Sequence, residues 1–159
     1  MPLVEDTRQQ KNKHIIKAEY FKTIGEHVVR CALPVGDYQR PAPVAVDTKK
    51  DINELAKDLK QDNARFQREL AKARDLGTVL VILVENRDGI TCLAELAQWV
   101  EPLTTYNARN YTGKAKRYKG EPIAKACQRL HEKYGTYFAF CTPEEAGEKI
   151  VRILDNWGR

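Results

Sequence analysis

Two aspartates and a lysine within one short stretch of the chain have the residue types needed for metal-assisted chemistry. The stretch "LPVGDYQRPAPVAVDTKK" spans residues 33–50. It contains Asp37 at a predicted turn, Asp47 at the end of a predicted strand, and Lys49 two residues later. Residues two apart on a strand project from the same face, so Asp47 and Lys49 should project together. A return of the chain after the turn would bring Asp37 beside them.

This grouping fits hydrolysis of a phosphodiester. Two neighbouring carboxylates repel each other unless one is protonated or a cation lies between them. Mg²⁺ suits such a pair because it takes oxygen ligands and keeps several waters. The ion would stabilise charge on a phosphodiester oxygen and lower the pKa of a bound water. Lys49 would orient that water or stabilise the developing charge. Because D-x-K at a strand end is common, a hairpin with incidental charges is the alternative.

The elements that must position these residues mix strands and helices. The apolar run "VLVILV", residues 79–84, predicts a central strand covered on both faces. Thr142, Pro143 and Glu145 form a capping-box pattern that predicts a helix start. Further strands are predicted at 3–8, 26–33, 43–49 and 136–140, and helices at 12–25, 52–77, 92–100 and 122–134. Residues 104–120 lack periodicity and are predicted to be a loop. The order indicates an α/β sandwich with a mixed sheet.

Composition places the chain among soluble globular proteins of one domain. It has 159 residues, of which 42% are hydrophobic and 31% charged. Its longest apolar run is too short to cross a bilayer, and the N-terminus lacks the apolar core of a secretory signal. We therefore expect a cytoplasmic protein without a membrane partner. The four cysteines form no CxxC pair and are predicted to be buried, reduced thiols.

Positive charge is concentrated in one part of the chain. The net charge is +5, and residues 104–133 alone carry +6, from eight basic and two acidic residues. Such an excess indicates a polyanionic partner, with a solvated loop and helix face as the alternative. Within 104–119, cations would meet phosphates and tyrosines could stack on unpaired bases. The candidate DNA-binding residues there are Arg109, Lys114, Lys116, Arg117, Lys119, Tyr111 and Tyr118.

Three motifs in order resemble the XPF-type structure-specific nuclease domain of the PD-(D/E)XK superfamily. That family runs D-x-R-E, then V-G-D-Y, then E-R-K-x-x-x-D, and this chain has "EDTRQQ", "LPVGDY" and "VAVDTKKDINEL". The matching positions are Asp6 and Arg8, then Gly36 and Asp37, then Asp47 and Lys49. "DNARFQRE" is similar to a further family region and supplies Arg65 as its arginine. Arg65 would contact DNA or the site, or be an ordinary exposed helix charge.

The resemblance implies a restriction-endonuclease-like fold with a central mixed β-sheet flanked by α-helices. It implies one nuclease domain over residues 1–159, without a helix-hairpin-helix domain, as in small stand-alone versions from phages and bacteria. The implied activity is a metal-dependent DNA endonuclease acting on branched, flap or junction DNA in repair or recombination. Asp37 and Asp47 would bind Mg²⁺ or Mn²⁺, and Lys49 would assist the water. Asp6 would be an auxiliary carboxylate holding Arg8 or a water, and Arg8 would contact a phosphate or pair with a site carboxylate. The alternative is a plain surface pair of Asp6 and Arg8.

The chain departs from the family pattern at four positions. Gln9 replaces a glutamate, Asp47 a glutamate, Thr48 an arginine and Asn53 an aspartate. These changes leave a minimal site of Asp37, Asp47 and Lys49. They also keep two alternatives open: a DNA-binding module whose chemistry has decayed, and a nuclease subunit, homodimeric or part of a larger repair complex. Glu85, after the central strand, is interpreted as a solvated strand end, with a place in the site as its alternative.

Overall fold

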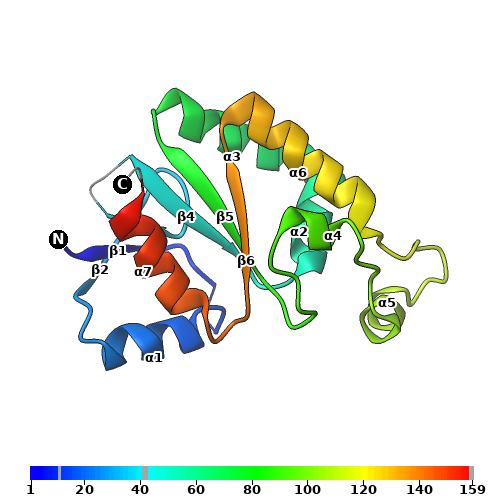
Figure 1. Cartoon of the computed structure of the whole chain (residues 1–159), viewed down its shortest axis with the longest axis horizontal. Coiled ribbons are helices and arrows are strands. Elements are labelled where there is room, and N and C mark those ends of the chain that lie inside the picture. The colour runs from blue at the N-terminus through cyan, green and yellow to red at the C-terminus, as the bar shows by residue number, and fades with distance from the viewer. Residues whose placement is uncertain (11, 41–42, 158–159) are drawn as a thin grey trace.

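A six-stranded mixed sheet forms the centre of the molecule (Figure 1). The computed structural model describes residues 1–10, 12–40 and 43–157. β3 runs antiparallel to both of its neighbours, and the other pairings are parallel. The strands in spatial order are β2 (Val28–Cys31), β1 (Leu3–Asp6), β3 (Tyr38–Gln39), β4 (Val44–Lys49), β5 (Val79–Glu85) and β6 (Tyr137–Cys141).

Helices cover both faces of this sheet, so the predicted layered α/β architecture is confirmed. One face carries α1 (Ile15–Thr23) and α7 (Ala146–Asn156), which contact each other. The opposite face carries α2 (Ile52–Lys60), α3 (Asn63–Asp75), α4 (Leu93–Leu96) and α6 (Gly120–Tyr134). α5 (Leu103–Arg109) lies to the side of the sheet, at the right of Figure 1.

Alternation along the central strands divides the core in two. Ala45 packs with α2, α3 and α6, whereas Val44 and Val46 pack with α1 and α7. Successive residues of β5 alternate between the same two clusters, which confirms a strand covered on both faces. The parity predicted for β4 is therefore correct, and Asp47 and Lys49 follow Ala45 on the α2–α3 side.

The directions of the strands place the carboxyl ends of most of them on the same side of the sheet. The carboxyl ends of β1, β4, β5 and β6 meet there because these strands are parallel. The antiparallel β3 begins at the same edge, directly after Asp37. We call this side of the sheet the carboxyl edge. It gathers Asp6, Asp37, Lys49 and Glu85 from four separate stretches of the chain.

The first helix is shorter than predicted, and it buries only some of its apolar side chains. Ile15 and Ile16 are 51% and 39% exposed, while Lys17 and Phe21 are each only 1% exposed. Phe21 packs in the α1–α7 core, and Lys17 reaches a buried carboxylate. Apolar spacing alone could not indicate that Lys17 is buried, because its partner Glu85 lies far along the chain.

Residues 52–77 form two helices rather than the single one predicted. The Asp62 N–H donates to the Lys57 carbonyl at 3.1 Å, five residues back, which breaks the regular ladder at the end of α2. α3 then starts at Asn63 and packs against α2. Apolar residues in both helices face the same core. Because their spacing continues across the break, the sequence pattern did not indicate that one helix ends and another begins.

The loop predicted at 104–120 is wrong in its first part, which forms α5. None of the described residues of α5 is buried, so the helix has no apolar face that periodicity could reveal. The predicted capping box after β6 does form. Thr142 N donates to Glu145 at 2.9 Å, and Glu145 N donates to the Thr142 hydroxyl at 3.3 Å, with α7 beginning at Ala146. All four cysteines are free thiols, but only Cys127 and Cys141 are buried.

Candidate active site

Asp37 is fixed at the carboxyl edge by its backbone. Its N–H donates to the Val46 carbonyl at 2.7 Å, and its carbonyl accepts from Asp6 N at 2.8 Å. The preceding Gly36 has φ +75°, and an added Cβ there would lie 3.0 Å from the Val46 carbonyl oxygen. Glycine therefore allows the close approach that places Asp37 between β1 and β4.

Lys49 lies between two carboxylates. Its ammonium is 2.8 Å from Asp47 Oδ2 and 2.8 Å from Asp58 Oδ2, a residue of α2. The Asp47 contact is an ion pair rather than an aligned hydrogen bond. The ammonium also lies 5.2 Å from the centre of the Phe66 ring. All three charged side chains are largely buried, so the arrangement is fixed and poorly screened by solvent.

The surroundings shift the proton affinities of this cluster. Burial raises the pKa of Asp47; the nearby Lys49 opposes the rise and Asp37 adds to it. Burial alone would lower the pKa of Lys49, but Asp47 and Asp58 outweigh it and hold that pKa above its usual value. Glu69 on α3 has its pKa raised to about 7, first by burial and then by Asp47. The site thus holds more acidic groups than the sequence motif indicated.

A second lysine, not predicted from the sequence, enters the cluster beside Asp37. The Lys13 ammonium lies 2.6 Å from the Thr48 carbonyl oxygen, 3.8 Å from Asp37 Oδ2 and 3.5 Å from Glu54 Oε1. Asp37 Oδ2 also accepts from the Thr48 N–H at 2.9 Å and from its hydroxyl at 2.6 Å. Asp37 is therefore held by the strand residue that replaces the arginine of the family pattern.

Asp37, Asp47 and Thr48 carry oxygens of the kind that a divalent cation with several retained waters would bind. Asp37, Asp47 and the Thr48 carbonyl supply two carboxylates and one neutral oxygen, and Mg²⁺ commonly binds through one or two carboxylates. The Lys13 ammonium already marks this region as one that attracts a cation. Within residues 1–10, 12–40 and 43–157, no three His, Cys, Asp or Glu side chains are grouped for metal binding. The backbone carbonyl and waters would complete the ligand set.

Asp6 and Arg8 are brought together. Arg8 Nε lies 3.2 Å from both carboxylate oxygens of Asp6, and the Arg8 guanidinium donates to the Leu33 carbonyl. Asp6 Oδ1 also accepts from Leu33 N at 2.9 Å. Asp6 therefore holds both Arg8 and the chain leading into the Gly36 turn. The Arg8 side chain is 63% exposed, so it remains open to solvent beside the site.

The neutral residues at the departures have structural partners. The Gln9 side-chain amide donates to the Asp37 carbonyl at 2.9 Å, which supports the placement of Asp37. Asn53 donates to Glu101, far along the chain. Asn53 thus connects α2 to the segment before α5.

Glu85 is buried, so its interpretation as a solvated strand end is wrong. It pairs with Lys17 at 2.6 Å, and both side chains are almost fully enclosed. Burial raises the pKa of Glu85, and Lys17 opposes that rise. Lys17 also donates to the Lys13 carbonyl at 3.3 Å. This buried pair therefore anchors the main chain that carries Lys13.

Two of the predicted DNA-binding residues, Arg109 and Tyr118, pack against each other inside the segment. Arg109 contacts the fully buried Glu101 through two bonds of 2.7 and 2.8 Å, and its guanidinium lies 3.9 Å from the centre of the Tyr118 ring. Tyr118 is only 7% exposed, and Lys60 covers it as well. Stacking of an unpaired base on Tyr118 would require this packing to open. Both residues are thus engaged within the protein, and their role in DNA binding stays a prediction.

The remaining predicted contacts face solvent. Tyr111 is 88% exposed, and Arg117, although exposed, donates to the Glu101 carbonyl at 2.5 Å. Arg65 is 73% exposed and lies 4.0 Å from Asp58 and 3.7 Å from Asp62, so it borders the Lys49 cluster. The lysines that stay exposed in residues 110–119 are Lys114, Lys116 and Lys119.

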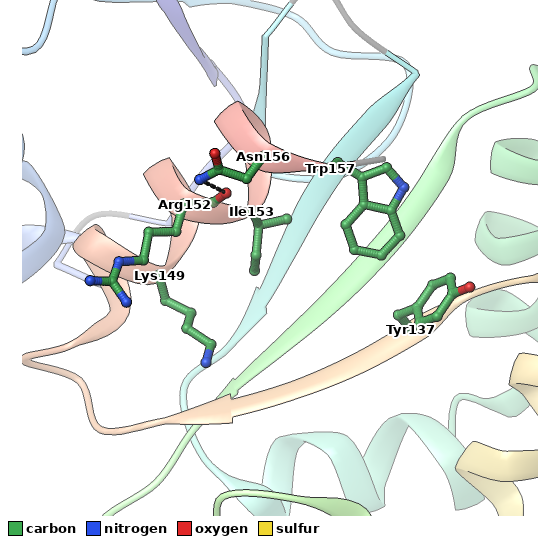
Figure 2. A pocket seen from close by; sticks show the side chains of 6 residues that line it. All are labelled: Tyr137, Lys149, Arg152, Ile153, Asn156 and Trp157. Atoms are coloured by element: carbon green, nitrogen blue, oxygen red, sulfur yellow. Dashed lines mark hydrogen bonds between the residues drawn. The ribbon is translucent and has the colours of Figure 1, made fainter. Parts of the chain in front are cut away.

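Cavities lie both at the site and away from it. A hollow of about 210 Å³ opens beside Lys49, Asp58, Arg65, Phe66 and Glu69. Another of about 380 Å³ lies between α7 and the start of β6, where Tyr137 and Trp157 approach each other (Figure 2). That second hollow is at the opposite end of β6 from the carboxyl edge, and the described residues that line it include no Asp or Glu.

Comparison with known proteins identifies the fold. No protein-family model and no curated protein sequence matches the chain. XPF from Aeropyrum pernix superposes with a TM-score of 0.64 at 18% identity, over 96% of this chain and 64% of that one. The same protein in complex with DNA gives 0.64 at 19% identity, over 96% and 62%. The chain therefore spans less than two thirds of those proteins and has an XPF-type nuclease fold. In the described part of the chain, no helix is long and apolar enough to span a membrane.

Proposed function

We propose that this protein is a DNA endonuclease that hydrolyses phosphodiesters with Mg²⁺ or Mn²⁺ and acts on branched DNA. The observation that carries the proposal is the Asp47–Lys49 pair, 2.8 Å apart, at the edge where Asp37 is also fixed. The XPF-type fold supports it, because related solved structures include one in complex with DNA. Repair or recombination would be the setting, with a homodimer or a larger complex as the acting form.

Each side chain has a role that follows from its contacts. Asp37, Asp47 and the Thr48 carbonyl would hold the metal, which supplies charge stabilisation and a more acidic bound water. Lys49, held by Asp47 and Asp58, would place its ammonium against the charge that develops on the phosphate. Asp6 would orient Arg8 toward a neighbouring phosphate.

DNA would be held by the exposed cations around the site. Arg65 borders the Lys49 cluster, and Lys114, Lys116, Arg117 and Lys119 extend from the segment after α5. Phosphate contacts of this kind add affinity without reading the sequence. Tyr111, the most exposed of the tyrosines in that segment, would stack on an unpaired base.

Cleavage of a substrate panel tests the proposal. Forked, flapped, four-way and linear DNA are incubated with Mg²⁺ or Mn²⁺ and the parent protein, Asp47→Ala, or Asp47→Asn as a closer isostere. We expect cutting of branched substrates, and a loss of about 10³-fold in the single-turnover rate for both variants. Asp75→Asn, an exposed carboxylate at the end of α3, is the matched control and should cut normally. Equal cutting by Asp47→Ala and the parent would exclude the proposed chemistry.

A DNA-binding module without cleavage is the second candidate. The observation in its favour is the Lys13 ammonium beside Asp37 and the Thr48 carbonyl, where a metal would bind. This candidate predicts branched-DNA binding that is the same with EDTA and with Mg²⁺, and no product on any substrate. The same panel therefore separates the two functions.

A further inference from the structure

Three oxygens from separate elements surround the Lys13 ammonium. They belong to the Thr48 carbonyl of β4, to Asp37 before β3 and to Glu54 of α2, at 2.6, 3.8 and 3.5 Å. Two of these groups, Asp37 and the Thr48 carbonyl, are among the proposed metal ligands. The Lys13 side chain is only 15% exposed, so the ammonium lies within the cluster rather than on its rim.

Lys13 and Lys49 neutralise different parts of this acidic cluster. Lys49 is committed to Asp47 and Asp58, on the α2–α3 side. Lys13 serves Asp37 and Glu54. A divalent ion that bound Asp37 and the Thr48 carbonyl would meet the Lys13 ammonium at the same oxygens. Two cations at that separation repel strongly in a poorly solvated site.

The surroundings allow the side chain to leave while its backbone stays. The Lys13 carbonyl accepts from Lys17, which is fixed by its buried pair with Glu85. A cavity of about 370 Å³ lies next to Lys13 and is lined in part by Gln10, Lys50 and Glu85. Rotation about the side-chain bonds of Lys13 would therefore carry the ammonium out of the cluster into this space.

We propose that Lys13 is a built-in competitor of the divalent metal, whose ammonium occupies the cation position until the ion displaces it. This inference rests on the proposed metal-dependent function and adds a control on metal affinity to it. The competitor keeps the carboxylates neutralised and in place when no metal is bound. Its removal should tighten metal binding and also leave the metal-free cluster less stable.

Mn²⁺ binding without DNA is the direct test. Isothermal titration and the electron paramagnetic resonance of free Mn²⁺ give the dissociation constant for the parent, Lys13→Met and Lys50→Met. Lys50 is exposed and lines the same cavity, so its substitution removes a nearby charge without touching the three oxygens. We expect Lys13→Met to bind Mn²⁺ about tenfold more tightly, and Lys50→Met to match the parent within about twofold.

Thermal unfolding provides a second measurement. In EDTA, Lys13→Met should melt below the parent, because Asp37 and Glu54 lose their cation. Saturating Mn²⁺ should raise its melting temperature by more than it raises that of the parent. If Lys13→Met does not fold, Lys13→Gln retains a donor for the Thr48 carbonyl without the charge and replaces it in both measurements.

The outcomes separate this inference from the nuclease proposal. Mn²⁺ affinity that is equal or weaker in Lys13→Met, an equal gain in Lys50→Met, or no Mn²⁺ binding by any variant would overturn the competitor role. Tighter Mn²⁺ binding by Lys13→Met with no DNA cleavage would support the competitor and reject the nuclease. Metal-dependent DNA cleavage by the parent, together with an unchanged Mn²⁺ affinity in Lys13→Met, would support the nuclease and reject the competitor role.

Discussion

The carboxyl edge and the basic segment, residues 103–119, differ in how far their charges are exposed to solvent. At the edge, Asp47, Lys49 and Asp58 are each 7% exposed and contact one another. In the basic segment, Lys114, Lys116 and Lys119 are exposed. Glu101, just before the segment, is completely buried and accepts hydrogen bonds from Arg109 and from the Tyr118 N–H. Burial acts to raise the pKa of Glu101, but these hydrogen bonds outweigh it and hold that pKa below its usual value.

The difference in exposure indicates that the carboxyl edge is suited to a chemical step and the basic segment to binding. Charges in a poorly solvated cluster interact strongly and keep a fixed geometry, which is what a chemical step requires. Exposed lysines are screened and adaptable, which suits contacts to a phosphate backbone of any sequence. Changes at the edge should therefore affect turnover, and changes in the basic segment should affect affinity.

The comparison between the carboxyl edge and the basic segment predicts its largest effect, a loss of turnover, for Lys49→Met. The variant keeps an unbranched apolar stem but removes the ammonium between Asp47 and Asp58. We expect the single-turnover rate to fall about 10²-fold, while the dissociation constant for branched DNA in Ca²⁺ changes less than about threefold. Circular dichroism should accompany the assay, because two buried carboxylates lose their partner. A large loss of DNA affinity with normal turnover would contradict this assignment of roles.

A smaller effect is expected from the basic segment. Changing Lys114, Lys116 and Lys119 together to alanine should weaken DNA binding about thirtyfold and lower the slope of log K against log salt by about 2 to 3. Turnover at saturating DNA should remain unchanged. A triple variant at Lys22, Lys72 and Lys149 changes the net charge equally, and its residues are exposed on α1, α3 and α7. Fluorescence anisotropy at several salt concentrations measures the DNA affinity and the salt slope of both triple variants. An equal loss of DNA affinity in the two variants would contradict a special role of the basic segment.

The smallest effect concerns the pH dependence of stability at Glu69. Its pKa is raised to about 7 in the folded protein, so ionisation favours the unfolded chain, and stability should fall as pH rises from about 4.5 to 7. Glu69→Gln should therefore be more stable than the parent above pH 7, by about 1 kcal/mol because the side chain keeps some solvent contact. The difference should vanish near pH 4. Urea unfolding in EDTA at pH 4, 6 and 8 measures this, and a constant difference would contradict the assignment.

Local patterns predicted much of the frame. The consecutive apolar residues of β5, the alternation along β4 and the capping box before α7 are each set by neighbours in sequence. Because strand geometry fixes which residues share a face, the Asp47–Lys49 pairing followed from two positions alone. The turn at Gly36 was also predicted from the sequence, because a glycine–aspartate pair is typical of turns.

Only tertiary structure decided which additional charges surround that pair. Asp58 and Glu69 arrive on separate helices, and Lys13 reaches Thr48 across 35 positions of sequence. Such contacts depend on the order of the strands and on the packing of the helices. The sequence next to each residue carries no periodic pattern that would predict them. The sequence by itself determined that two carboxylates and a lysine would share an edge of the sheet. The packing of α1 and α2 against the sheet decided that a second ammonium, from Lys13, would lie at the same edge.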